Sequence, residues 1–359
     1  MQDYELSILE QYPVTVKSTR KMRGAFFCDT DQGLFLLREA GVSKRRVLLM
    51  RHVGLHLLRE GGLRTDLPVA NRDGAYVTVS PDGRSYILKE WYAGRECDVR
   101  RTRELLEGTA NLAHLHRFME RVPPCPAPEE PAPEEPATEG PGPGEDGEVQ
   151  EERGPVEEPP RRSLGKEYES HNRELRKIRR FIREKPSRGE FELAFLGCFD
   201  SMFAWAQRAM EELERTDCGA LDEKSRQENT MLHGDYNYHN ILLTDAGCVT
   251  TNFDRCRPGV QAEDLYYFLR KAMEKHGWNV RCADHMLDAY SAIRPLSAAE
   301  TDYLKVRLIY PEKFWKLADA YYRSGKAWIP VKSVEKLRTA VMQTEEKGRF
   351  LEQIFRVRM

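Results

Sequence analysis

Apolar and polar positions along the first hundred residues alternate in short runs, a pattern typical of a small β-sheet. Apolar runs bounded by turn residues predict strands at 14–16, 25–28, 34–37, 75–80 and 85–91. Between the third and fourth runs, residues 44–59 carry a broad apolar face at helical spacing. Gly61 and Gly62 follow this face, so the sequence predicts a helix that ends at a glycine stop.

The rest of the chain follows helical spacing. Amphipathic or apolar patterns predict helices over 102–119, 166–184, 191–213, 264–275 and most of 279–355. The expected fold class is therefore α+β, with two lobes. A small β-rich N-lobe with one helix is expected over residues 1–92, and a large, mostly helical C-lobe over residues 93–359.

Residues 122–160 interrupt the helical pattern. They hold twelve of the chain's 20 prolines and twelve acidic residues against one arginine, a net charge of −11. Proline removes backbone donors and like charges repel, so this segment cannot bury a core. We expect a disordered acidic insert within one domain, with an interdomain linker as the alternative. Since the whole chain carries −2, the remainder carries +9.

Composition and charge exclude several classes of protein. With 40% hydrophobic and 32% charged residues, and no apolar run approaching the roughly 18 residues of a membrane span, no membrane span is expected. The first residues lack the basic and apolar regions of a secretory signal. The eight cysteines form no C-x-x-C pair, which indicates reduced thiols of an intracellular protein. The sequence has no stripe of interleaved arginines and aromatic residues, so no nucleic-acid partner is expected.

Candidate chemistry is concentrated in a catalytic-type loop at 233–254. Residues 233–240 read H-G-D-x-x-x-x-N and precede a short apolar strand. Kinases use this spacing for phosphoryl transfer. Asp235 is the candidate that accepts or orients the proton of an attacking hydroxyl, and His233 is grouped with it as a catalytic candidate. Asn240 is a candidate Mg²⁺ ligand. The alternative is a simple turn before a strand, but the full octapeptide is more specific than that.

Asn252 stands where such a site normally has its second acidic metal ligand. An amide can coordinate a cation but does not neutralise its charge. Asp254 lies two residues further on, and we expect it to point elsewhere unless the loop shifts. The sequence thus predicts a kinase-like site with a weakened metal position.

Candidate nucleotide contacts fall in the N-lobe. Arg38 stands on the third strand, where a lysine that reaches the phosphates is usual, and the following helix lacks the glutamate that normally pairs with it. A solvated strand-end charge is the alternative for Arg38. Glu90, Trp91 and Tyr92 occupy the position of a hinge whose backbone binds adenine, although Trp91 and Tyr92 equally suit a core.

Together, residues 233–240, 253–256, 91–96 and 310–330 resemble the CotS-type spore-coat proteins of endospore-forming Firmicutes. That family is a branch of the aminoglycoside/choline phosphotransferase-like kinases. The resemblance covers most of the chain apart from the insert. It implies a bilobal protein-kinase-like fold, with ATP and Mg²⁺ as candidate cofactors. It also implies synthesis in the mother-cell cytoplasm, deposition in the spore coat, and other spore-coat proteins as partners.

By position, the resemblance makes Asp235 the catalytic base, Asn240 a magnesium ligand, and Asp264 the carboxylate that braces the catalytic loop. His116 is expected to be a hydrogen-bonded structural residue. Asn252, Arg38 and the missing helix glutamate favour a weakly active or inactive kinase that works in coat assembly. The alternative is an active ATP-dependent phosphotransferase acting on a small-molecule or protein hydroxyl. A third and weaker hypothesis is an antibiotic-modifying kinase.

Overall fold

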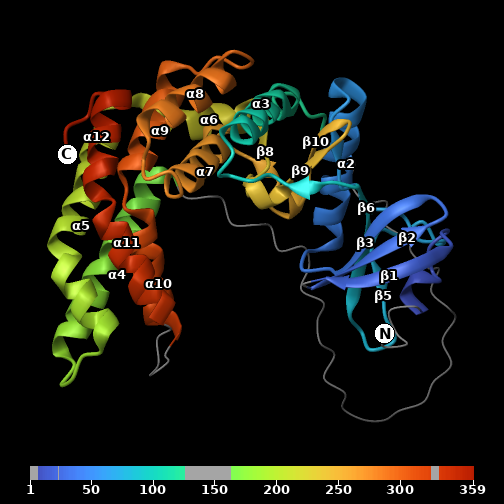
Figure 1. Cartoon of the computed structure of the whole chain (residues 1–359), viewed down its shortest axis with the longest axis horizontal. Coiled ribbons are helices and arrows are strands. Elements are labelled where there is room, and N and C mark those ends of the chain that lie inside the picture. The colour runs from blue at the N-terminus through green and yellow to red at the C-terminus, as the bar shows by residue number, and fades with distance from the viewer. Residues whose placement is uncertain (1–6, 23, 126–162, 325–330) are drawn as a thin grey trace, which may run out of the picture.

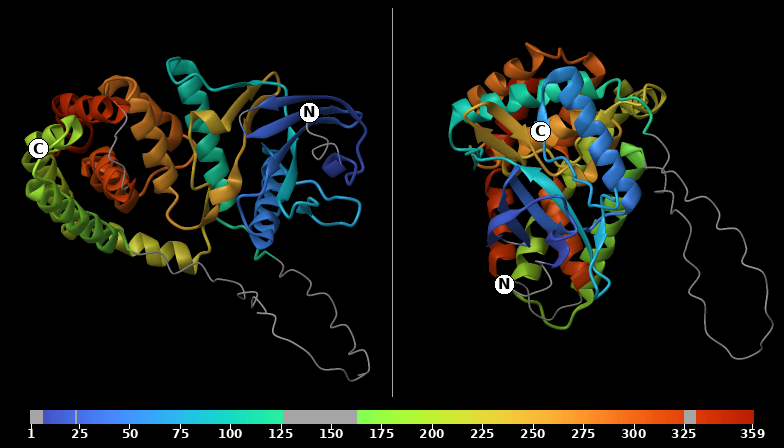
Figure 2. Two further views of the ribbon diagram at one scale, coloured as in Figure 1. Left: turned by 90° about the horizontal axis from the view of Figure 1, so that it is seen from below. Right: turned by 90° about the vertical axis from the view of Figure 1, so that its right-hand side faces the viewer.

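The computed structural model describes residues 7–22, 24–125, 163–324 and 331–359. It has the two lobes that the sequence predicts. The β-rich N-terminal region lies at one end of the molecule and a group of long helices lies at the other (Figure 1). A view at right angles shows the same order along the long axis, with α3 and the central strands between the two ends (Figure 2).

The N-terminal region is an antiparallel sheet of five strands in the order β1-β2-β3-β6-β5. Its strands are Val16–Met22, Ala25–Thr30, Gly33–Glu39, Ser85–Trp91 and Thr78–Val79 in that order. Helix α2 (Lys44–Gly61) follows β3; Ser43 caps its first turn and Gly62 ends it in the left-handed conformation. The fully buried side chains of Leu37 and Leu88 help to build the core beneath this sheet.

A second sheet joins the N-terminal region to the helical part. It has the order β4-β10-β9-β7, formed by Arg64–Thr65, Gly247–Thr250, Ile241–Thr244 and Arg95–Glu96. β4, which directly follows α2, pairs in parallel with β10. β10 and β9 form the hairpin that follows Asn240. A third, two-stranded sheet pairs β8 (Met231–Leu232) with β11 (Arg257–Pro258). These pairings hold both ends of the 233–254 loop.

Most of the remainder of the described chain is helical. They are α3 (Thr102–Met119), α4 (Leu164–Glu184), α5 (Glu190–Glu214), α6 (Ala220–Gln227), α7 (Ala262–Met273), α8 (Val280–Ser291), α9 (Ala298–Ile309), α10 (Glu312–Ser324), α11 (Val331–Met342) and α12 (Thr344–Phe355). The largest core surrounds α3, α7, α8 and α9. A separate core joins α4, α5, α10 and α11 through stacked rings such as Phe195 and Phe314.

Most sequence predictions about these elements are confirmed. The helices predicted at 44–59, 102–119, 166–184 and 191–213 appear within two residues of their expected bounds. The strand predicted at 75–80 contracts to Thr78–Val79, and α6 carries no apolar face strong enough to have been predicted. The insert predicted at 122–160 lies, after its first four residues, outside the described part of the chain. All eight cysteines are free, and among the described helices none is long and apolar enough to cross a membrane.

Candidate active site

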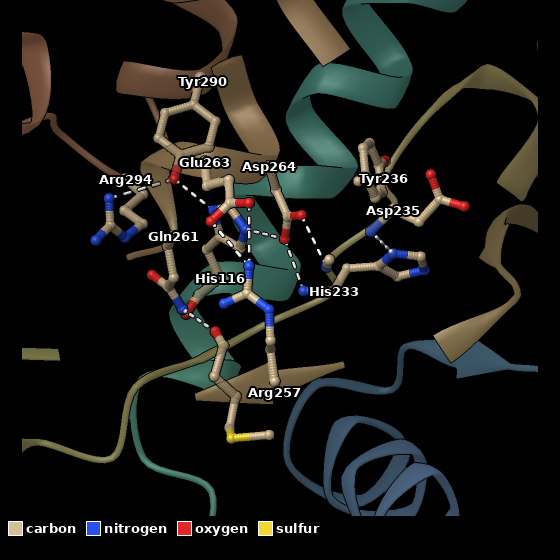
Figure 3. Close-up of polar contacts among 12 residues, drawn as sticks. His116, His233, Asp235, Tyr236, Arg257, Gln261, Glu263, Asp264, Tyr290 and Arg294 are labelled. Atoms are coloured by element: carbon tan, nitrogen blue, oxygen red, sulfur yellow. Dashed lines mark hydrogen bonds and ion pairs between the residues drawn. The ribbon is translucent and has the colours of Figure 1, made fainter. Parts of the chain in front are cut away.

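The loop that begins at His233 is held by a single buried carboxylate. Asp264, on α7, accepts hydrogen bonds from the backbone N–H groups of His233 at 2.6 Å and Gly234 at 2.9 Å (Figure 3). Asp264 is also 3.3 Å from the Nε2 atom of His116, whose Nδ1 lies 2.6 Å from the hydroxyl of Tyr290. Burial lowers the pKa of His116, so a neutral ring donates to Asp264 and accepts from Tyr290. Asp264 therefore holds the backbone of the loop, and His116 holds Asp264.

His233 itself does not face the open site. The residue is fully buried; its Nε2 lies 2.9 Å from the carbonyl of Thr251, and its Nδ1 accepts from the backbone N–H of Asp235 at 3.1 Å. With both ring nitrogens bonded to backbone, the side chain fixes the loop rather than reaching a substrate. These contacts favour a positioning role for His233, and its grouping with the catalytic residues stays a prediction.

Gly234 must be a glycine for two reasons. Its φ of +82° lies in the left-handed region, and an added Cβ would meet the backbone oxygen of Arg255 at 2.2 Å. The loop and the segment after residue 252 thus approach each other backbone to backbone.

Asp235 and Asn240 lie together at the end of this loop. The Nδ2 atom of Asn240 donates to the backbone oxygen of Asp235 at 2.8 Å, and Asn237 donates to the Asp235 carboxylate at 3.2 Å. The backbone N–H of Thr251 donates to the carbonyl of Asn240 at 2.9 Å, which links the loop to the following hairpin. Asp235 is half-buried, so its carboxylate remains accessible to a ligand.

Asn252 and Asp254 both turn toward Arg38. Asn252 adopts the left-handed conformation, with φ of 68°, and residues 253–255 form a 3₁₀ turn. Arg38 donates to the side-chain oxygen of Asn252 at 3.1 Å and forms an ion pair with Asp254. The expectation that Asp254 points elsewhere is therefore wrong, because the turn brings its carboxylate back beside Asn252. Arg38 is likewise not a solvated strand-end charge.

Lys89 and Asp66 complete this cluster, and sequence reasoning missed both. Lys89 is fully buried on β6; its Nζ lies 2.9 Å from Asp66 and 3.3 Å from Asp254. Both oxygens of Asp66 also accept from the backbone N–H of Asn252 at 3.0 Å. Burial lowers the pKa of Lys89, and the charge of Asp66 opposes that shift. A lysine inside the apolar run 86–91 was the one signal available in the sequence.

The predicted hinge residues lie at the end of β6. The backbone N–H of Glu90 donates to the carbonyl of Leu67 at 2.8 Å, so this donor is already engaged. The hydroxyl of Tyr92 lies 3.1 Å from the carbonyl of Thr65 and 3.2 Å from the Glu90 carboxylate. Trp91 is partly buried and pairs in register with Leu34. The side chains of Glu90 and Tyr92 are thus in contact with each other, and adenine recognition by Glu90, Trp91 and Tyr92 stays a prediction.

The cluster as arranged does not suit a Mg²⁺–nucleotide pair. Mg²⁺ takes oxygen ligands, usually with one or two carboxylates among them. The Asn252 oxygen already accepts from a guanidinium, and the carboxylates of Asp66 and Asp254 are paired with Lys89 and Arg38. A divalent ion here would have to share these carboxylates with Lys89 and Arg38 or displace one of the two cations. Asp235 and Asn240 take part in none of these ion pairs and remain in contact with each other.

Comparisons with known proteins agree on family and fold. The model of the family described as "Spore coat putative kinase YutH" matches residues 170–354, just over half of the chain. Spore coat protein S of Bacillus subtilis (strain 168) is 21% identical over 97% of this chain and 92% of its own. An aminoglycoside phosphotransferase structure from Alicyclobacillus acidocaldarius has a TM-score of 0.78 at 17% identity, covering 98% of this chain and 95% of that one. The AMP-bound spectinomycin phosphotransferase APH(9)-Ia has a TM-score of 0.62 at 11% identity, covering 100% and 98%.

Proposed function

Because the chain belongs to the YutH family of kinase-like spore coat proteins, we propose that it acts in spore-coat assembly through binding, with weak or no phosphotransferase activity. In this proposal its partners are other spore-coat proteins, and it passes from the mother-cell cytoplasm to the coat. Spore coat protein S, with 21% identity over nearly the whole chain, supports the coat assignment. The predicted kinase-like fold with spore-coat resemblance is confirmed by these comparisons.

The proposal of weak activity rests on the cluster around Arg38, in which the cationic and acidic side chains neutralise one another. A kinase places a cation on the nucleotide phosphates and holds its metal ion with at least one carboxylate. Here Arg38 and Lys89 are bound to Asp254 and Asp66, and Asn252 adds no negative charge. We expect the loss of the principal metal carboxylate to cost several kcal/mol of transition-state stabilisation, at about 1.4 kcal/mol per tenfold in rate.

One observation favours the alternative of an active ATP-dependent phosphotransferase. Asp235 and Asn240 keep their mutual contact, and Asp264 holds the loop that carries them. Asp254 also places one carboxylate beside Asn252, where displacement of Arg38 would free it for a metal. In this alternative the acceptor is a hydroxyl of a small molecule or a protein.

The third hypothesis, an antibiotic-modifying kinase, gains less support. The likeness to spectinomycin phosphotransferase, at 11% identity, extends to fold alone. Cationic drugs require an acidic pocket, whereas the chain outside residues 122–160 carries +9. Resistance to an aminoglycoside on expression in a sensitive host would revive this hypothesis.

Calorimetric titration of the purified chain with ATP, with and without Mg²⁺, tests the proposal. We expect weak binding that Mg²⁺ does not strengthen. In Asn252→Asp a carboxylate is restored at the metal position, so Mg²⁺ should tighten ATP binding at least about tenfold, or ~1.4 kcal/mol. Asn229→Asp is the matched control, because Asn229 is also a left-handed asparagine but lies outside the site, and it should leave binding unchanged.

Turnover distinguishes the two main functions. Substantial phosphate transfer or ATP hydrolysis by the native chain that disappears in Asp235→Ala would overturn the proposal and establish the alternative. If neither the native chain nor Asn252→Asp binds ATP, the kinase fold serves as a binding scaffold alone, and partners should be sought among coat proteins.

A further inference from the structure

Three potential metal ligands meet between α4 and α10, away from the kinase-like site. One ligand atom from each of Glu167, His171 and Glu312 lies within 4.8 Å of the others. Glu167 and His171 are four residues apart on α4 and therefore share one face of that helix. Glu312 is the first residue of α10, directly after Pro311. The three side chains thus come from the facing surfaces of two packed helices.

Buried polar atoms without partners gather at this place. The Nδ1 atom of His171, the Oε2 atom of Glu312 and the hydroxyl of Tyr168 are all buried and have no hydrogen-bond partner in the described structure. Glu312 is only 7% exposed and Tyr168 is fully buried. Burying an ionised oxygen without a partner is costly, so a bound ligand would remove a penalty at this position.

The charges around the cluster leave room for a cation. Arg307 donates to Glu167 at 3.0 Å, but a carboxylate offers about four lone-pair sites and can share them with an ion. Lys316 lies 3.0 Å from the Oε1 atom of Glu312 and is 55% exposed, so it can swing into solvent. Arg270 is paired with Glu274, although its charge and that of Arg307 also act on Glu312.

We propose that Glu167, His171 and Glu312 form a binding site for a first-row divalent cation of the Zn²⁺ type, which ties α4 to α10. One imidazole and two carboxylates are a ligand set that such ions accept. Ligand distances of about 2.0–2.2 Å require the side chains to draw together by roughly 1 Å from their present separation. The ion would cross-link two helices of the C-terminal region and would be independent of the nucleotide position.

Zinc titration of the chelator-treated full chain, followed by calorimetry and by thermal unfolding, tests this site. We expect one Zn²⁺ per chain and a higher melting temperature in its presence. Glu312→Gln and His171→Ala should each weaken Zn²⁺ binding at least about tenfold and abolish the thermal shift. Lys316→Ala should strengthen binding, because it removes the cation that competes for Glu312.

Two controls match the site variants in chemistry. Glu169→Gln changes an exposed glutamate of the same helix, and His114→Ala removes an exposed histidine of α3; both should bind Zn²⁺ like the native chain. Failure of the native chain to bind Zn²⁺ would overturn the proposal and leave these polar atoms to water. Binding that persists in both Glu312→Gln and His171→Ala would also overturn it, because the ion would then lie elsewhere.

Discussion

Asp264→Ala is expected to lower the free energy of unfolding by about 3–5 kcal/mol, because it removes the charged partner of several buried donors at once. Asp264 is only 1% exposed, and its carboxylate accepts hydrogen bonds from the backbone N–H groups of His233 and Gly234. Alanine cannot replace either bond, and the ring of His116 loses its acceptor as well. Urea unfolding monitored by circular dichroism measures the change.

Asp288→Ala is the control for this variant, since Asp288 is an exposed aspartate on α8. It should change the unfolding free energy by less than about 0.5 kcal/mol. Asp264→Asn should fall between the two, because an amide keeps one acceptor oxygen. A loss below about 1 kcal/mol in Asp264→Ala would contradict the role of Asp264 in holding the loop.

The sequence revealed the fold because its elements are long and strongly patterned. Helix 102–119, for example, repeats leucines at helical spacing and begins and ends at the predicted residues. The shortest strands could not be predicted in this way. β4, β7, β8 and β11 have two residues each, and they pair with segments far along the chain. No local pattern could show that Arg64–Thr65 runs beside β10.

The candidate site was visible only in part for a similar reason. The spacing of 233–240 identified the loop, but the direction of Asp254 depends on the left-handed Asn252 before it. In the sequence, Lys89 is a polar residue in a largely apolar strand, and only the fold places Asp66 at 2.9 Å from it. Ion pairs between residues far apart in sequence determine how free the Arg38 cation is, and motif spacing carries no information about them.

Lys347 is a partly buried lysine that the kinase-like site does not use. Its Nζ atom lies 4.7 Å from the ring centre of Trp205 and 5.4 Å from that of Trp278, and donates to the carbonyls of Ile309 and Tyr310 at 3.2 and 3.4 Å. Burial lowers its pKa to about 7; the carboxylates of Glu274 and Glu312 act against this shift and Arg270 adds to it. The unfolded chain restores the ordinary value of about 10.4.

Lys347→Met is therefore expected to flatten the pH dependence of stability between about pH 7 and 10. In that window the unfolded chain holds a proton on Lys347 that the folded chain has released, so native stability should rise with pH. The contribution of this one group is at most ~1.4 kcal/mol per pH unit, and it is complete above the unfolded pKa. Methionine has no proton to release and fills similar space, so the variant should be more stable than the native chain near pH 7.

Urea unfolding at several pH values, in chelator to keep Glu312 free of metal, measures the slope for both proteins. Lys336→Met serves as the control, because Lys336 is an exposed lysine of α11 and is hydrated in both states. It should keep the native slope. Equal slopes in Lys347→Met and the native chain would show that Lys347 keeps its proton after folding. The two indole rings and two carbonyls around the Nζ atom would then stabilise the ammonium enough to offset its burial.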